Sequence, residues 1–93
     1  MNEFKFQIIV QDVTFDGKYT IIIPDFNIVL IHKAKDLDEC KLIAINEIND
    51  HTDNLKNIDE LRLSEEEKSM IISNTLQMSY SLFHIMTVSI EEN

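Results

Sequence analysis

The sequence predicts an α+β fold in which a small antiparallel sheet carries one main helix on one face. Two observations predict it. The first third of the chain holds short apolar segments bounded by turn residues, the first of them with period-two alternation, and a capped segment with apolar residues every three or four positions follows. The expected order is three strands, a helix, a possible second helix and a last strand. With 93 residues and 44% apolar content, we expect residues 1–93 to form a single domain with a modest core.

The first three strands are indicated by residue alternation and by turn residues between them. Residues 4–10 alternate with period two, which is typical of a strand with one buried face. Asp16-Gly17 predicts a tight turn, because glycine tolerates positive φ, and residues 19–23 form the returning strand. Pro24 cannot donate a ladder hydrogen bond and should end this strand, so residues 27–33 are the third strand of a meander.

A helix is predicted to begin after Asp36. Asp36 can accept a hydrogen bond as the N-cap, Glu39 stands three places on, and the acids of the first turn suit the helix dipole. Its sheet-facing side is expected to comprise Leu37, Cys40, Ala44 and Ile48, widened by Leu42, Ile43 and Ile45. The helix should end near residues 50–52.

Residues 53–75 are expected to form a variable acidic excursion on the surface with a possible short helix. The sequence Ser64-Glu65-Glu66-Glu67 has the pattern of a helix start, which places that helix over residues 65–73. Alternating residues 77–90 then predict one long strand that rejoins the sheet.

The charge balance limits the partners of this chain. Eight Lys and Arg residues stand against 17 Asp and Glu, a formal net charge of −9. This charge repels phosphate backbones, so direct nucleic-acid binding is disfavoured and a basic protein partner is favoured. The only cysteine, Cys40, lies on the apolar side of the helix and suits a reducing cytoplasm. The chain has no leader-like start and no apolar run long enough to span a membrane, so we expect a soluble protein.

No residue pattern indicates catalysis, a cofactor or a metal. Asp12, Asp16 and Asp25 could gather as metal ligands near strand ends, but their preference for turns and corners is the stronger explanation. The three histidines have no ligand-like spacing, and a single glycine cannot build a phosphate loop. Cys40 is expected to be a core residue rather than a nucleophile. The sequence therefore favours a protein that is not an enzyme.

The order of motifs in the first half of the chain resembles the N-terminal domain of the HicB antitoxins. The positions that carry this resemblance are Gly17 and Tyr19, the corner Pro24-Asp25-Phe26, and the helix start from Asp36 to Glu39. Two positions depart from the family pattern: Asn27-Ile28-Val29 replaces its Pro-Gly-Cys, and Lys33-Ala34-Lys35 replaces the glycine before the helix. The match covers about half of the chain, and the DNA-binding domain of many HicB proteins is expected to be missing.

The resemblance implies a partial ribonuclease-H-like fold that has no nuclease activity and acts by covering a partner. In that family the partner is HicA, a small basic ribonuclease toxin. The acids expected to contact such a partner are Asp53, Asp59, Glu60, Glu65, Glu66 and Glu67. Two alternatives remain open: these acids form an ordinary solvated surface, or they belong to a phage or mobile-element inhibitor that imitates nucleic acid against a defence nuclease. Because a small sheet leaves its edges unpaired, we also expect a homodimer joined through strand edges.

Overall fold

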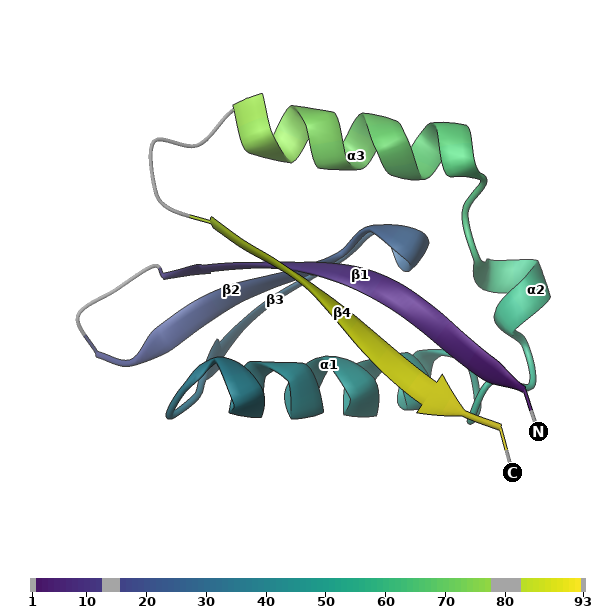
Figure 1. The fold of residues 1–93 in the computed structure, drawn as a ribbon, viewed down its shortest axis with the longest axis horizontal. Coiled ribbons are helices and arrows are strands. Elements are labelled where there is room, and N and C mark those ends of the chain that lie inside the picture. The colour runs from purple at the N-terminus through teal and green to yellow at the C-terminus, as the bar shows by residue number, and fades with distance from the viewer. Residues whose placement is uncertain (1, 13–15, 78–82, 93) are drawn as a thin grey trace.

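The computed structural model describes residues 2–12, 16–77 and 83–92. Two helices lie on opposite faces of one antiparallel sheet (Figure 1). In chain order the elements are β1 (Glu3–Asp12), β2 (Lys18–Ile23), the 3-10 turn η1 (Pro24–Phe26), β3 (Ile28–Lys33), α1 (Leu37–His51), α2 (Ile58–Leu61), α3 (Glu65–Gln77) and β4 (Phe83–Glu91). The predicted α+β class and antiparallel sheet are confirmed.

The four strands have the order β3-β2-β1-β4, and each neighbouring pair is antiparallel. Successive side chains of β1 point to opposite faces. Phe6, Ile8 and Val10 lie on the face covered by α1, whereas Lys5 and Gln7 lie on the face covered by α3. Strands β3 and β4 form the two edges of the sheet.

The main core lies between α1 and the sheet. Asp36 caps the helix as predicted, because its Oδ1 accepts a hydrogen bond of 2.9 Å from the Glu39 backbone N–H. Cys40, Ala44 and Ile48 are fully buried against the strands, which confirms the predicted apolar side of the helix. The prediction for Leu42 was wrong: its side chain is 60% exposed, because its position on the helix turns it away from the sheet.

The turn and the corner in the first half have the expected backbone. Gly17 has φ of +79°, the left-handed region that glycine adopts without strain. Pro24 ends β2 and begins η1, and Asn27 at φ of 54° reverses the chain into β3. Asp25 was expected to cap this corner. Its carboxylate is instead fully buried and bonded to distant residues, as described below.

The excursion over residues 53–75 is more structured than predicted. A short helix, α2, was missed, and Leu55 and Ile58 join the main core from this segment. The second predicted helix exists as α3 and continues to Gln77, so the prediction that the last strand begins at residue 77 was wrong. The helix persists there because Ile71, Ile72 and Thr75 are half-buried on its sheet-facing side. Residues 78–82 of the predicted strand lie outside the described residues, and β4 is described from Phe83.

The chain runs back and forth between two ends of the molecule (Figure 1). We call the first the termini end: it holds both chain termini, η1, α2, the start of α3 and the close of α1. We call the other the distal end: it holds the close of β1 and β3 and the start of β2 and α1. The acidic and basic residues of each element therefore lie at one or the other of these two ends.

Candidate protein-binding surface

All the acids predicted to contact a partner lie at the termini end and are exposed. Asp53 lies in the loop after α1, Asp59 and Glu60 lie on α2, and the three consecutive acids Glu65 to Glu67 form the first turn of α3. Three consecutive elements thus bring the six predicted residues to the same end of the molecule.

The start of α3 is fixed by the capping box that the sequence predicts. The Ser64 hydroxyl accepts a hydrogen bond from the Glu67 backbone N–H at 3.2 Å and donates one to the Glu67 carboxylate at 3.1 Å. A hydrogen bond from the Lys68 ammonium lowers the pKa of Glu65, and the positive charge of Lys68 adds to the effect. The acids of this turn also face the positive end of the helix dipole. The first turn of α3 is therefore suited to hold negative charge.

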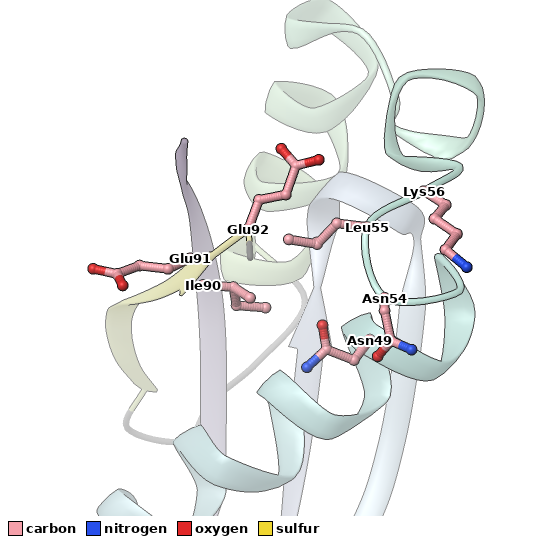
Figure 2. A pocket seen from close by; sticks show the side chains of 7 residues that line it. All are labelled: Asn49, Asn54, Leu55, Lys56, Ile90, Glu91 and Glu92. Atoms are coloured by element: carbon pink, nitrogen blue, oxygen red, sulfur yellow. The ribbon is translucent and has the colours of Figure 1, made fainter. Parts of the chain in front are cut away.

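Two acids that were not assigned to this surface join it from the end of β4. Glu91 and Glu92 are among the residues that line a cavity of about 360 Å³ between the end of β4 and the loop that follows α1, and Figure 2 shows the Glu91 carboxylate pointing away from that loop. Asn49, Asn54 and Lys56 supply the other polar groups, and Leu55 and Ile90 supply apolar ones. Residues so distant in sequence give no local signal of their proximity, and only the pairing of β4 with β1 brings them together.

The loop beside this cavity has an unusual backbone. Asp53, Asn54 and Leu55 are all left-handed, with φ of 51°, 57° and 73°. Aspartate and asparagine adopt this region at small cost, but leucine does so only when its surroundings hold it there. Leu55 is held because its side chain is buried in the core.

Thr52 holds the same loop from within. Its hydroxyl, fully buried, donates to the Ile48 carbonyl at 2.7 Å and accepts from the Leu55 backbone N–H at 2.9 Å. The Asn57 backbone N–H donates to the Thr52 carbonyl at 3.0 Å. The loop that presents Asp53 is therefore fixed by buried hydrogen bonds.

The charges of the chain are distributed unequally between its two ends. When each residue is assigned to the nearer end of its element, twelve acidic and four basic residues lie at the termini end. Five acidic and four basic residues lie at the distal end. Nearly all of the net charge therefore belongs to the termini end. We use the term acidic surface for its exposed acids Asp53, Asp59, Glu60, Glu65, Glu66, Glu67, Glu91 and Glu92.

A buried ionic cluster joins the acidic surface to the sheet. Asp25 is 0% exposed, and its Oδ2 lies 2.6 Å from Arg62 Nε and 3.7 Å from Lys68 Nζ. The Asp25 carbonyl accepts a hydrogen bond of 2.7 Å from the Leu63 backbone N–H. The corner at η1 thus anchors the chain on both sides of the start of α3.

Arg62 extends this cluster onto β1. Its Nη2 donates to the Lys5 carbonyl at 3.0 Å, and its guanidinium lies 4.9 Å from the centre of the Phe6 ring. The sequence did not reveal these contacts. The available signal was the position of Asp25 within the apolar stretch from residue 21 to residue 26. A carboxylate in such a stretch is expected to be buried, and a buried carboxylate requires a cationic partner.

The residues considered for chemistry do not form a cluster. Among the described residues, no group of three or more His, Cys, Asp or Glu side chains could hold a metal ion. Cys40 is fully buried as predicted, and burial raises the pKa of its thiol, which keeps it protonated. The His51 ring packs on Phe26, with ring centres 5.3 Å apart, at the close of α1.

No family model, curated protein or solved structure was found to match this chain. Within the described part of the chain, no helix is both long and apolar enough to cross a membrane.

Proposed function

We propose that this chain is a non-catalytic cytoplasmic protein, similar to the HicB antitoxins, that neutralises a small basic ribonuclease by covering its RNA-binding surface. The observation that carries the proposal is the concentration of negative charge on the acidic surface. A ribonuclease that binds RNA presents a positive surface, and a fixed array of carboxylates complements it.

The rigidity of the acidic surface supports this role. Its acids are mounted on the start of a capped helix, on α2 and on a loop held by Thr52, and the Asp25 cluster ties these elements to the sheet. Fixed charges lose less conformational entropy on binding than charges on a flexible tail. The ribonuclease-H-like ancestry of the sheet belongs to the same proposal and is supported by the motif order in the sequence.

The test measures the cleavage of a fluorogenic RNA by a small basic ribonuclease from the same source as this chain, with and without the chain in excess. We expect cleavage to be suppressed at a stoichiometric ratio, with an inhibition constant that rises with salt, because screening weakens the contact between charges. A ribonuclease that cleaves at an unchanged rate in the presence of saturating chain would refute the proposal.

A matched pair of variants separates the acidic surface from total charge. Glu60→Gln with Glu66→Gln removes two negative charges from the acidic surface, and Asp12→Asn with Asp38→Asn removes two from the distal end. We expect the first variant to weaken inhibition at least tenfold and the second to change it less than twofold. Equal losses would show that net charge, and not the acidic surface, is responsible.

The decoy alternative makes a different prediction for the same surface. A nucleic-acid mimic would bind a DNA-cleaving or DNA-binding protein and would be displaced by duplex DNA in direct competition. Inhibition of the small basic ribonuclease without such binding supports the antitoxin-like role, and the reverse result supports the decoy.

A further inference from the structure

We propose that the open edge of β3 joins two copies of this chain into one continuous antiparallel sheet, with Val29 of each copy paired with Ile31 of the other. The sequence predicts a homodimer through strand edges but does not say which edge. The proposal goes beyond the binding of a ribonuclease, because self-association is measured on the chain alone.

The register of β3 against β2 shows which backbone groups face outward. The Ala34 N–H donates to the Gly17 carbonyl at 3.1 Å, and the ladder continues with Lys18 opposite Lys33. Hydrogen-bonded and non-hydrogen-bonded pairs alternate along an antiparallel ladder. Every second residue of β3, namely Val29, Ile31 and Lys33, therefore directs its N–H and C=O away from β2 to the open edge.

The side chains of the same residues form an exposed apolar strip. Val29 and Ile31 are 62% and 65% exposed, and both lie on the face of the sheet that α3 covers elsewhere. An edge strand with unpaired backbone groups and exposed apolar side chains, and without a proline or bulge, is a template for another strand. Within the described residues nothing covers this edge.

The outward carbonyl of Lys33 is already satisfied, which fixes the register. The His32 ring lies with Nδ1 2.7 Å from the Lys33 carbonyl oxygen. Apart from the Lys33 N–H, the outward groups that still require partners are those of Val29 and Ile31. A two-fold axis through Leu30 pairs Val29 of each copy with Ile31 of the other. These two pairs give hydrogen-bond partners to the outward N–H and C=O groups of Val29 and Ile31 in both copies.

The charges favour a second copy as the occupant. β3 runs from the termini end to the distal end and closes with the basic residue Lys33. Antiparallel pairing of two β3 strands therefore places Lys33 of one copy near the termini end of the other copy. Lys33 then extends past β3 of the partner copy toward η1, which α3 contacts at its acidic first turn. Lys33 and that turn lie on the same side of the sheet, so opposite charges meet at both ends of the joined strands.

The other edge lacks these features. The Glu92 N–H donates to the Asn2 carbonyl at 2.9 Å, so the same alternation turns Phe83, Ile85, Thr87, Ser89 and Glu91 of β4 outward. Three of these five side chains are polar or charged. Acidic and polar residues on an edge discourage strand addition, and β3 is the edge that association should use.

The test is the mass of the chain in solution, measured by sedimentation velocity and light scattering from 1 to 100 µM. We expect the unmodified chain to have the mass of two copies. Val29→Lys with Ile31→Lys should give the mass of one copy, with an unchanged circular dichroism spectrum because both side chains are exposed. The matched control, Ile85→Lys on the β4 edge, should remain dimeric.

A disulfide tests the register. Leu30→Cys places two thiols at the two-fold axis in a non-hydrogen-bonded pair, where Cβ atoms approach closely enough for a disulfide. We expect mild oxidation to link this variant and not the unmodified chain, whose Cys40 is buried. Linkage of Ile31→Cys instead of Leu30→Cys would overturn the register. A monomer at 100 µM, or dissociation by the Ile85→Lys change alone, would overturn the proposal.

Discussion

Helices α1 and α3 cover opposite faces of the same sheet but are held there by different interactions. Helix α1 buries Cys40, Ala44 and Ile48 completely, whereas α3 has no fully buried residue and exposes Met70 to 60%. What α3 has instead is the Asp25 cluster at its first turn. The difference indicates that α1 supplies apolar packing on its face of the sheet, whereas α3 is held chiefly at its first turn, where the acidic surface lies.

The largest effect is expected from a substitution in the core between α1 and the sheet. Ile48→Ala removes a fully buried side chain from the main core, so we expect a loss of about 2–5 kcal/mol in the free energy of unfolding. Ile72→Ala, at a half-buried position of α3, should cost less than about 1 kcal/mol, because the Ile72 side chain buries less apolar surface on folding than Ile48 does. Urea unfolding of both variants measures the difference. Equal losses would show that α3 is as tightly packed as α1.

The second effect concerns the Asp25 cluster. Arg62→Ala leaves a fully buried carboxylate with only the more distant Lys68, and we expect it to cost about 3 kcal/mol. Asp25→Asn in the Arg62→Ala background should recover part of this loss, because it removes the buried charge. The measurement is a double-mutant cycle by urea unfolding. Additive losses would mean that Arg62 acts through its contact with Phe6 and not through Asp25.

Sequence patterns predicted the α1 side of the molecule well, because its signals are local. Period-two alternation placed β1, the turn at Gly17 and the corner at Pro24 placed β2 and β3, and the Asp36 cap placed the start of α1. Leu42 was misassigned, because an apolar residue in a helix does not reveal which way it points. The ribonuclease-H-like relation, the homodimer and the partner stay predictions.

The α3 side was predicted less well, because its contacts join residues distant in sequence. The Asp25 carboxylate bonds a residue 37 positions away, and the cavity of Figure 2 joins β4 to the loop after α1. The left-handed backbone of Leu55 has no sequence signal, since leucine disfavours it. Six of the eight acids of the acidic surface were identified from the sequence, but Glu91 and Glu92 were not, and the common location of all eight depends on the tertiary fold.

A smaller effect sharpens the comparison at the loop that carries Asp53. Thr52→Val keeps the shape of the side chain but leaves the Leu55 N–H without its buried acceptor, and we expect a loss of about 1–2 kcal/mol. Thr52→Ser retains the hydroxyl and is the control, with a smaller loss. Hydrogen exchange should show the Leu55 amide losing protection in the valine variant. Retained protection would show that the left-handed turn does not depend on Thr52.

The smallest effect tests whether the first turn of α3 responds to pH independently of α1. The hydrogen bond from Lys68 lowers the folded-state pKa of Glu65 below its ordinary value of about 4.5, which we take for the unfolded chain. A carboxyl with a lowered folded pKa stabilises the fold above its unfolded pKa, and this stabilisation is lost as the pH falls through the folded pKa. Hydrogen exchange of α3 should therefore be slower in the unmodified chain than in Glu65→Gln at pH 6, and the two should converge at pH 3. Protection of α1 amides should be the same in both proteins at each pH. A difference that persists at pH 3, or one that extends to α1, would mean that Glu65 acts through packing and that the two helices are not separately held.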